Sequence, residues 1–298
     1  MTCGERTALV FGGGGARGAY ALGVAEYLCA RGKQEDAFRF DLVVGSSCGA
    51  LVGAVYCADV FDQVREVFLN LRRRQVMRLD FMRLLSGRGV FDQSGLLRLL
   101  QEHLGDDRIA QAATTLAVVS TDIRTGRLVV FNSREHGGMM TLAAYCSAII
   151  PVVCPPFKLN LMALGDGGYR SILPVRTALE MGATRILAVS VTPSRFPVFE
   201  GTMGSPIRLL WRWIELLSGQ AERAELEYAR LRLDGKEESL LVMSRVKLIA
   251  PQGIAMPDPI AFDAGTARRL YETGRMQASQ AFDGHKSPWE APCYSFGD

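Results

Sequence analysis

The chain has 298 residues, of which 48% are hydrophobic and 22% are charged, a composition that excludes a disordered or fibrous protein and fits one large α/β domain or two small ones. Its 34 basic and 31 acidic residues leave a net charge of +3, which is too small an excess to indicate a nucleic-acid-binding protein. The seven cysteines include no C-x-x-C pair, so neither a disulfide framework nor a zinc site is indicated.

Short apolar runs alternate along the chain with stretches of helical periodicity. In the first part of the chain, this pattern predicts strands over 7–11 and 40–44 and helices over about 18–31, 48–57, 59–71 and 93–103. In the second part, it predicts strands over 115–120, 127–131, 159–164, 185–191 and 240–249, and helices over about 206–231 and 262–282. The strands over 115–120 and 127–131 should pair through a turn at Thr125-Gly126.

The repeated strand-then-helix order predicts a mostly parallel central sheet with helices on both faces, that is, an α/β fold of three layers, α/β/α. Residues 185–191 form the continuous apolar run that a sheet covered on both faces requires. Neither an internal repeat nor a low-complexity linker interrupts the order. We therefore expect one domain over 1–298, with its diagnostic motifs within about 5–192 and a helical and strand extension over about 200–285.

The beginning of the chain and its longest uncharged stretch bear on location. Residues 1–6 lead directly into the first predicted strand and do not resemble a signal peptide. The stretch 137–157 is nominally long enough to span a bilayer, but three prolines interrupt it. We interpret it as a helix followed by a buried turn, and the cytoplasm is the expected location.

The first candidate site is the run Gly12-Gly13-Gly14-Gly15-Ala16-Arg17-Gly18, between a predicted strand and a predicted helix. Consecutive glycines can turn several N–H groups toward one point, and the start of the helix adds positive potential there. Such a loop binds a phosphate or stabilises the oxyanion of a tetrahedral acyl intermediate. Glycine richness does not decide between these two roles and an ordinary tight turn.

The second candidate site is Gly45-Ser46-Ser47-Cys48-Gly49. Only Ser47 has a glycine two residues away on each side, so it is the serine that fits G-x-S-x-G. The preceding strand and the following helix provide the context of a nucleophile elbow, in which the amide of Cys48 is a natural oxyanion donor. A serine in an ordinary strand-to-helix turn is the alternative. A Cys48 thiol nucleophile is disfavoured, because Cys48 lies one residue past the apex of the turn.

The third candidate site is Asp166, in Gly165-Asp166-Gly167-Gly168 after the predicted strand 159–164. Open α/β sheets bind their ligands at the carboxyl ends of their strands, although an aspartate that caps a loop would look the same.

A serine nucleophile needs a base, normally a histidine. His103 ends a predicted surface helix and His136 lies in a polar loop; only His285 comes late enough for the Ser…Asp…His order of α/β hydrolases, and it follows the last helix in a polar tail. A carboxylate that acts directly on Ser47 is therefore favoured. This requires an oxygen of Asp166 roughly 2.6–3.2 Å from the hydroxyl.

The glycine run also satisfies the dinucleotide-binding pattern G-x-G-x-x-G. A dinucleotide site further needs an acid where the second strand ends. That end reads Gly45-Ser46-Ser47, Asp41 stands at the strand's beginning, and no G-K-S/T follows the glycines. We therefore expect no nucleotide cofactor.

Together these residues resemble the patatin-like phospholipase family. The glycine-rich motif of that family is similar to residues 12–18, its serine elbow resembles residues 45–49, and its D-G-G motif is matched by Asp166-Gly167-Gly168. A proline-rich approach to the aspartate, beginning at Cys146-Ser147, is also similar. The resemblance covers roughly 5–192. It departs at Ile172, where many members carry an asparagine before Leu-Pro, which affects the expected packing of the loop near the aspartate.

The resemblance implies a serine acyl hydrolase that cleaves carboxylic esters of phospholipids, lysophospholipids or neutral lipids, without metal, cofactor or histidine. It implies Ser47 as the nucleophile that carries the acyl intermediate and Asp166 as the general base. The oxyanion would be held by the amides of Gly13, Gly14, Gly15 and Cys48. The glycines beside the two reactive residues would support the serine and aspartate motifs, namely Gly45, Gly49, Gly167 and Gly168. Arg17 would tighten the glycine loop or meet a lipid phosphate, unless it is an ordinary surface arginine.

Two segments suggest peripheral contact with a membrane. Residues 72–88 interleave arginines with apolar residues, as in a lid or an interfacial segment, although an amphipathic helix packed on the core gives the same pattern. Residues 207–217 carry Trp211 and Trp213 at helical spacing, with core or dimer packing as the alternative. The oligomeric state is left open.

Two classes of function therefore remain. The favoured one is a lipid acyl hydrolase, because both reactive residues are present. The other is a catalytically weak lipid-binding or regulatory protein on the same fold.

Overall fold

A computed structural model describes residues 5–72, 78–79, 91–149, 154–193, 206–234 and 245–291. The main sheet has eight strands, namely β1 (Thr7–Phe11), β2 (Leu42–Ser46), β5 (Thr115–Asp122), β6 (Arg127–Asn132), β7 (Phe157–Leu159), β8 (Met162–Gly165), β9 (Arg185–Val189) and β10 (Val246–Ile249). A separate pair is formed by β3 (Arg78–Leu79) and β4 (Phe91–Asp92). The α-helices are α1 (Gly18–Gln34), α2 (Cys48–Ala58), α3 (Phe61–Leu69), α6 (Ser94–His103), α7 (Asp106–Gln111), α8 (Met140–Ser147), α9 (Val175–Glu180), α10 (Pro206–Leu233) and α11 (Ala264–Phe282).

The sheet is mostly parallel, as the order of elements predicts. Its strands follow the order β10-β9-β1-β2-β5-β8-β7, with β6 paired to β5. The first five of these run parallel, whereas β6, β7 and β8 are antiparallel additions at one side. Parallel strands bring their carboxyl ends to one edge, so the loops after β1, β2 and β9 meet there.

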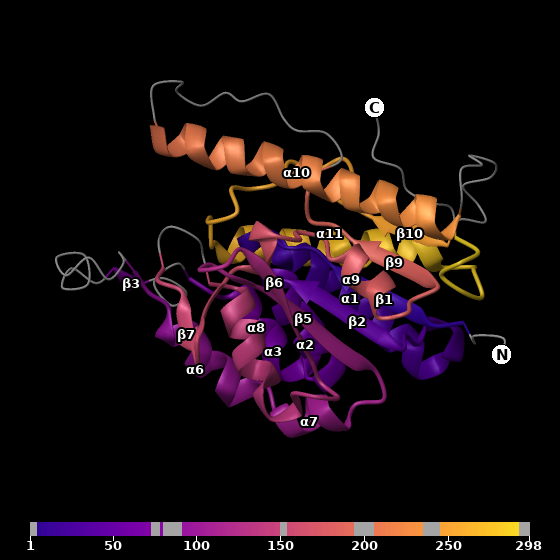
Figure 1. Ribbon diagram of the computed structural model, residues 1–298. Coiled ribbons are helices and arrows are strands. Elements are labelled where there is room, and N and C mark those ends of the chain that lie inside the picture. Colours follow the sequence, from indigo (N-terminus) through magenta and orange to yellow (C-terminus); the bar gives the residue numbers. More distant parts are fainter. Residues whose placement is uncertain are drawn as a thin grey trace.

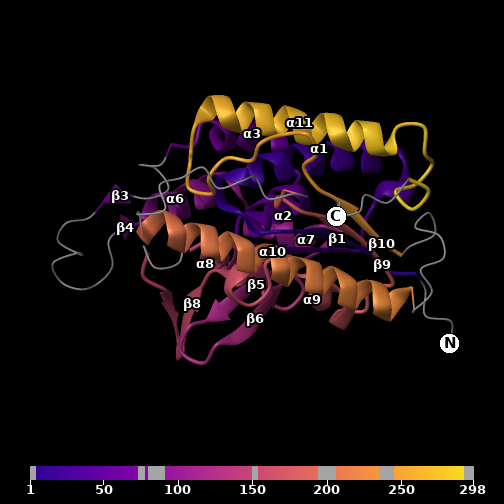
Figure 2. The same cartoon turned by 90° about the horizontal axis from the view of Figure 1, so that it is seen from above.

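Helices cover both faces of the sheet. Successive side chains of a strand point to opposite faces. Leu9 and Phe11 of β1 therefore pack into a cluster with residues of α1, α2, α8 and α11, whereas Ala8 and Val10 pack with residues of α9 and α10. Figures 1 and 2 show α10 and α11 on opposite sides of the strands. The predicted three-layer α/β/α fold is confirmed.

Several elements differ from the prediction. The strand predicted over 159–164 is instead the hairpin of β7 and β8, which turns at Asn160 with a φ of 51°, and β8 runs antiparallel to β5. Asn tolerates this left-handed backbone better than most residues, but the apolar pattern around it gives no sign of a reversal. Helices α7 and α9, of six residues each, were not predicted because they are too short to show a periodic pattern.

The C-terminal helix α11 is fixed against α1 along its length. A Cβ on Gly23 of α1 would lie 2.0 Å from the carbonyl oxygen of Tyr271, and one on Gly274 of α11 would lie 2.1 Å from that of Tyr20. The two backbones are therefore in direct contact, and any larger residue at either glycine would force them apart.

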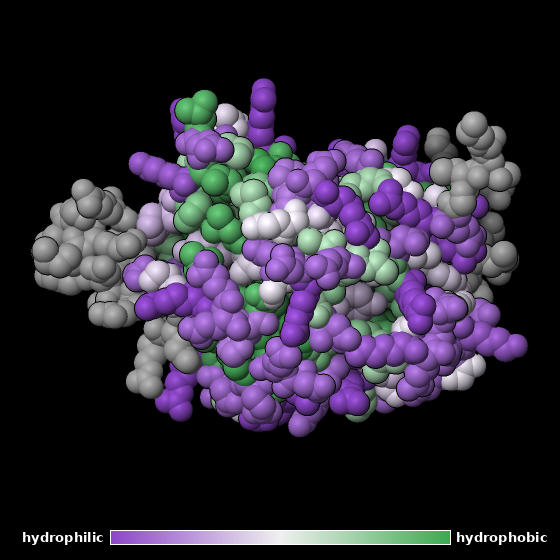
Figure 3. All heavy atoms as spheres, turned by 90° about the horizontal axis from the view of Figure 1, so that it is seen from below, coloured by the Kyte–Doolittle hydropathy of each residue, from purple (hydrophilic) through white to green (hydrophobic). Residues whose placement is uncertain are grey.

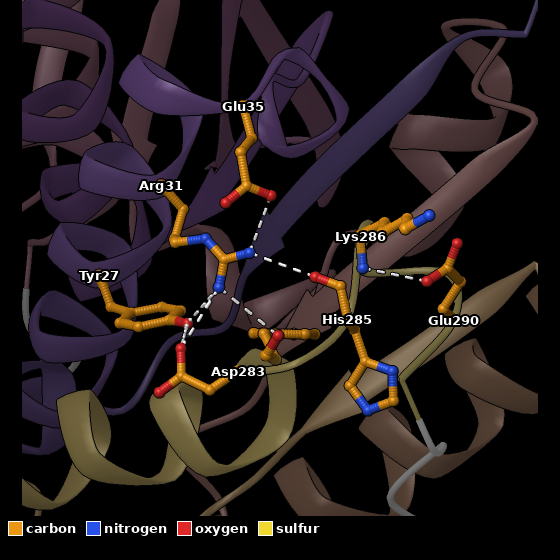
Figure 4. Close-up of polar contacts among 8 residues, drawn as sticks. Tyr27, Arg31, Glu35, Asp283, His285, Lys286 and Glu290 are labelled. Atoms are coloured by element: carbon orange, nitrogen blue, oxygen red, sulfur yellow. Dashed lines mark hydrogen bonds and ion pairs between the residues drawn. The ribbon is translucent and has the colours of Figure 1, made fainter.

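A polar cluster fastens the far ends of the same two helices (Figure 4). The guanidinium of Arg31 donates to the Tyr27 hydroxyl at 2.9 Å, to the carboxylates of Glu35 at 2.9 Å and Asp283 at 3.3 Å, and to the carbonyl oxygen of His285 at 3.2 Å. Tyr27 in turn donates to Asp283 at 2.6 Å. This cluster fixes the end of α11 at Phe282 against the end of α1.

The described surface is polar over much of its area. Seen from below, it is mostly hydrophilic, and apolar side chains gather mainly on the half that carries α6, α8 and β7 (Figure 3). Within the described segments, no helix is both long enough and apolar enough to cross a membrane.

Candidate active site

Ser47 occupies the turn between β2 and α2. Its φ of 54° and ψ of −128° place it in a backbone region that residues other than glycine rarely adopt. The turn has no room for side chains on its flanks, because a Cβ on Gly45 would lie 2.4 Å from the carbonyl oxygen of Gly49, and one on Gly49 would lie 2.3 Å from that of Phe11. This is the sharp strand-to-helix turn that the G-x-S-x-G spacing predicts.

Asp166 follows β8 and contacts Ser47 directly. The Ser47 hydroxyl donates to Oδ2 of Asp166 at 2.6 Å, within the range that the sequence hypothesis requires. The other carboxylate oxygen accepts from the Gly168 amide at 2.7 Å, and the Asp166 carbonyl oxygen accepts from the Thr121 hydroxyl at 2.9 Å. Ser47 is 8% exposed and Asp166 is 7% exposed, so the contact is shielded from solvent.

A second serine, which the sequence did not single out, holds the Ser47 turn in place. The amide of Ser47 donates to Oγ of Ser147 at 2.8 Å, and the Ser147 hydroxyl donates to the carbonyl oxygen of Val119 at 2.6 Å. Ser147 is the last residue of α8 and is fully buried. It lies in the proline-rich motif, which was the one signal for it, but sequence spacing does not show that its hydroxyl faces Ser47.

Burial shifts the two titratable groups beside the Ser47 hydroxyl. Loss of hydration raises the pKa of Asp166 to about 7, against the opposing effect of its hydrogen bonds with Ser47 and Gly168. Burial, reinforced by the nearby charge of Asp166, raises the pKa of the Cys48 thiol to about 12. The thiol is thus protonated at neutral pH, which argues against Cys48 as a nucleophile.

The glycine-rich loop lies against the Ser47 turn, but the Gly13 amide does not have the orientation that an oxyanion donor needs. A Cβ on Gly13 would lie 2.9 Å from Cβ of Ser47 and 2.8 Å from Cδ1 of Ile172. The Gly13 amide, predicted as an oxyanion donor, instead donates to the carbonyl oxygen of Ile172 at 2.8 Å. We therefore correct the predicted donor set by removing Gly13. Ile172, the departure from the family pattern, supports the glycine loop through both its carbonyl group and its side chain.

Two of the three remaining predicted donors line the pocket beside Ser47. The amides of Gly14 and Gly15 face the Cys48 sulfur, and both Gly15 and Cys48 line that pocket. Cys48 is the first residue of α2, so its own amide has no partner within the helix. The amides of Gly14 and Gly15 thus lie close to the positively polarised start of α2, where the Cys48 amide lies.

Arg17 ties the glycine-rich loop to the C-terminal part of the chain. Its guanidinium forms an ion pair with Glu215 of α10 at 2.5 Å and donates to the carbonyl oxygen of Pro257 at 2.7 Å. Next to it, the amide of Ala16 donates to the carbonyl oxygen of Pro259 at 2.7 Å. Arg17 is only 6% exposed, so it is not a surface arginine, and its paired guanidinium does not fit the tentative assignment as a contact for a lipid phosphate. It holds the loop.

Farther along, α10 packs two buried carboxyl groups against the same edge of the sheet. Glu225 accepts a hydrogen bond from the hydroxyl of Ser171 at 2.7 Å, and Glu222 faces Ser190 and Thr192, beyond β9. Burial raises the pKa of each carboxyl group to about 7. Helix α10 therefore contacts the loops that follow β1, β8 and β9.

The pocket beside Ser47 is lined mostly by apolar side chains from α1, α2, α3, α6 and the region around the start of α11, including Ala19, Leu51, Phe68, Leu96 and Phe262. It therefore suits the acyl part of an ester. Within the described segments, no three His, Cys, Asp or Glu side chains come together as ligands for a metal ion.

The three histidines lie away from the Ser47–Asp166 pair. His285 is at the Arg31 end of α1 (Figure 4), whereas the α1 start at Gly18 contacts Cys48; these ends lie roughly 20 Å apart along the helix. His136 accepts from the Asn132 amide through Nδ1 at 3.3 Å, and His103 lines a different pocket. This geometry excludes a triad through His285.

A serine at a strained strand-to-helix turn, hydrogen-bonded to an aspartate from a later loop, defines an α/β protein with a serine–aspartate pair at the carboxyl edge of its sheet. The family described as patatin-like phospholipase matches residues 9–179. The chain belongs to this family.

Curated relatives are similar to the chain over part of its length. An uncharacterized NTE family protein of Mycobacterium tuberculosis is 31% identical over 191 residues, which are 63% of this chain and 50% of the relative. Patatin-like phospholipase domain-containing protein 6 of Homo sapiens is 30% identical over 63% of this chain and 13% of its own length. Lysophospholipase NTE1 of Mycosarcoma maydis is 32% identical over 63% of this chain and 10% of its own. The chain spans half the length or less of these relatives.

Among solved structures, VipD from Legionella pneumophila aligns with 94% of this chain and 67% of its own chain, at 13% sequence identity and a TM-score of 0.46.

Proposed function

We propose that this chain hydrolyses carboxylic ester bonds of lipids through an acyl intermediate on Ser47, with Asp166 as the general base. The observation that carries the proposal is the 2.6 Å hydrogen bond between the two side chains, at the entrance of an apolar pocket. Family membership supports lipid acyl hydrolysis in general. The names of the relatives, a phospholipase domain protein and a lysophospholipase, favour a phospholipid or lysophospholipid as the substrate.

In the first half of the reaction, Oγ of Ser47 attacks the ester carbonyl carbon while Asp166 takes the hydroxyl proton. The carbonyl electron pair moves to the oxygen, and the resulting oxyanion is held by the amides of Gly14, Gly15 and Cys48. One such donor typically contributes about 10²–10³ in kcat. The bond to the alcohol then breaks, and Asp166 returns its proton to the departing oxygen.

In the second half, a water molecule attacks the acyl-Ser47 carbonyl while Asp166 takes one of its protons. The tetrahedral intermediate collapses, the bond to Oγ breaks, and the proton passes from Asp166 to Ser47. The fatty acid leaves, and the hydrogen-bonded pair is restored. A single carboxylate therefore serves both halves without a histidine.

Covalent labelling tests the nucleophile. A fluorophosphonate probe should label the wild-type protein at Ser47, and Ser47→Ala should remove both labelling and ester cleavage. Ser46→Ala is the matched control, because the neighbouring Ser46 hydroxyl is buried and hydrogen-bonds to no described group; this variant should be labelled normally. Asp166→Asn should lose ester cleavage while remaining folded.

Two results would contradict the proposal. Near-normal turnover by Asp166→Asn would show that Asp166 is not the general base. Labelling of Ser47→Ala equal to that of the wild-type protein would show that Ser47 is not the nucleophile. A folded wild-type protein that binds lipid but neither reacts with the probe nor cleaves esters would instead support a lipid-binding or regulatory function.

We also propose that α10 makes peripheral contact with lipid surfaces. Its described side chains include five exposed large apolar ones, between 39% and 60% exposed, namely Leu209, Trp213, Leu216, Leu217 and Leu231. Most of the other candidate, 72–88, lies outside the described residues. Wild-type protein should float with anionic vesicles and Trp213→Ser should float less; equal recovery of the two would contradict this contact.

A further inference from the structure

Three glutamates of α10 lie on one side of the helix, namely Glu215, Glu222 and Glu225. Their spacings of seven and three residues place the side chains above one another on the helix surface. This side is turned toward the protein, since Glu222 is only 2% exposed and Leu226 of the same helix packs with α9 and the strands (Figure 2). The three carboxyl groups can therefore contact the loops at the carboxyl edge of the sheet.

Glu225 holds the segment between β8 and α9. Its carboxyl group accepts the hydrogen bond from Ser171 at 2.7 Å and faces the backbone amide of Arg176. Between these two in the sequence stands Ile172, whose carbonyl oxygen accepts from the Gly13 amide at 2.8 Å and whose side chain would meet a Cβ on Gly13 at 2.8 Å. Glu225 therefore restrains the glycine-rich loop at Gly13 through this short segment.

Glu222 repeats this arrangement at the loop after β9. It faces the side chains of Ser190 and Thr192, which flank Val191 in the sequence. A Cβ on Gly14 would lie 2.4 Å from Cγ2 of Val191, so Val191 packs directly on one of the proposed oxyanion donors. Glu222 therefore restrains the next point of the same loop.

Glu215 contacts the loop directly, through its ion pair with Arg17. One helix thus restrains the glycine-rich loop at three points, which are Gly13, Gly14 and Arg17. Two of these restraints act through an apolar side chain and the third acts through a charge pair.

Stability alone does not account for Glu222 and Glu225. Each has one buried carboxyl oxygen that accepts no hydrogen bond from the described groups, and such groups cost folding free energy. Burial raises the pKa of each to about 7, and the charge of Glu222 adds to the effect on Glu225. The nearby Arg223 and Arg176 lower these pKa values by less than burial raises them. Costly buried groups of this kind, placed beside a reactive site, indicate a role in its geometry.

We propose that Glu222 and Glu225 are positioning residues for the proposed reaction, and that they place the amides of the glycine-rich loop by holding Val191 and Ile172 against it. This rests on the proposed function, since the loop stabilises the oxyanion of that reaction. Donors of this kind act only at hydrogen-bonding distance, and a displacement of about 1 Å in an active site costs roughly a hundredfold in rate. The two glutamates act through the loop and not on the substrate.

Replacing each carboxyl group by an apolar side chain tests the proposal. In Glu222→Leu and Glu225→Leu, kcat for a water-soluble butyryl ester should fall roughly tenfold or more, while KM changes less than about threefold, because the amides stabilise the transition state more than the bound ester. A dissolved ester keeps the lipid contact of α10 out of the measurement. Glu227→Leu is the matched control, since Glu227 is exposed on the same helix, and it should keep the kcat of the wild-type protein.

Conservative variants and stability separate positioning from a merely structural role. Glu222→Gln and Glu225→Gln keep an accepting oxygen of the same reach and should retain most of kcat. At about pH 8 the free energy of unfolding of the leucine variants should not fall with kcat, because leucine removes a carboxyl group that is ionised there at the expense of its hydration. If a leucine variant does not fold, Ser171→Ala removes the hydroxyl partner of Glu225 and should lower kcat without raising KM.

Hydrogen exchange of the peptide that covers the glycine-rich loop does not need catalysis. Its amides should exchange faster in Glu222→Leu and Glu225→Leu than in Glu227→Leu. If the wild-type protein cleaves no ester but this difference is found, the proposed function fails and the restraint of the loop stands.

Three results would overturn the positioning role. The first is a kcat and a loop exchange that are the same in the leucine variants and in Glu227→Leu. The second is an equal fall of kcat in the glutamine and leucine variants. The third is a fall of kcat that only accompanies a loss of stability.

Discussion

The hydroxyl of Ser47 lies 2.6 Å from Oδ2 of Asp166, although the two residues are 119 positions apart in the sequence. The contact is buried, and the loss of hydration raises the pKa of Asp166 to about 7. Near neutral pH the carboxyl group is therefore divided between its two protonation states, and only the ionised state can take a proton from Ser47. The titration of Asp166 should therefore affect both the rate of the proposed reaction and the free energy of unfolding.

The activity should follow this titration. We expect kcat/KM for an ester to rise with pH through an apparent pKa of about 7 and to level off above it, falling about tenfold per pH unit well below it. The measurement is a pH series with an ester whose alcohol does not titrate in this range. A flat profile would argue against Asp166 as the base, whereas a midpoint near the ordinary aspartate value of 3.8 would show that burial does not raise the pKa of Asp166.

The stability of the protein should decrease as the pH rises, whereas kcat/KM should increase. Between pH 3.8 and about 7 the folded state keeps a proton on Asp166 that the unfolded state has lost, so the free energy of unfolding decreases as the pH rises through this window. Above this pH window the total decrease in the free energy of unfolding amounts to roughly 4 kcal/mol, at 1.36 kcal/mol per unit of pKa shift.

Asp166→Asn removes this titration. Its free energy of unfolding relative to wild type should therefore increase by roughly that amount between about pH 4 and pH 8, as measured by urea denaturation. Glu222 and Glu225 titrate in the same window, but they are present in both proteins and cancel in the difference. A difference that does not depend on pH would contradict the pKa shift.

The ion pair between Arg17 and Glu215 should be strongly coupled. Removing one partner leaves a charge with little hydration, and a double-mutant cycle with Arg17→Met and Glu215→Gln should give a coupling free energy of roughly 2–3 kcal/mol. The control is the exposed pair Lys33–Asp59, whose side chains are 61% and 50% exposed and should couple by less than about 1 kcal/mol. Equal coupling in both pairs would mean that Arg17 does not hold the loop.

Gly15 should resist substitution more strongly than its backbone conformation alone requires. Gly15 and Gly126 have similar φ values, 58° and 67°, but a Cβ on Gly15 would lie 2.2 Å from the carbonyl oxygen of Pro259, whereas one on Gly126 would meet nothing within 4 Å. Gly126→Ala should cost about 1–2 kcal/mol of stability from the backbone strain.

Gly15→Ala should cost more than this in urea denaturation, and it should also lower ester cleavage, because relieving the contact with Pro259 shifts the loop that carries the proposed oxyanion donors. Equal losses of stability in the two variants, with activity retained in Gly15→Ala, would argue against the contact with Pro259.

The sequence predicts the fold and the central contact well because both depend on short-range patterns. Strand-to-helix order gives the parallel sheet, and the glycines around Ser47 and Asp166 mark the places where the backbone turns sharply at the sheet edge. The Ser47 turn lies at the carboxyl edge because β2 is parallel to its neighbours. Asp166 instead reaches it from β8, which runs antiparallel to β5, so the parallel-strand argument accounts for only one of the two turns.

The parts that escaped prediction depend on long-range contacts. Whether the Gly13 amide points to the pocket is decided by the Ile172 carbonyl, which is far away in the sequence. Ser147 reaches the Ser47 amide only because α8 packs beneath the turn. The burial of Arg17 likewise depends on Glu215, about two hundred residues later, and no local pattern contains that information.

The link between Arg17 and α10 limits how this protein can be recombined with its relatives. The region shared with the family ends at residue 179, before β9, which pairs with β1, and before α10. A hybrid that joins this region to the C-terminal part of another protein would enclose the Arg17 guanidinium without the Glu215 carboxylate. It would also replace β9, one of the two strands that pair with β1. Such grafts would need matching substitutions on both sides of the junction.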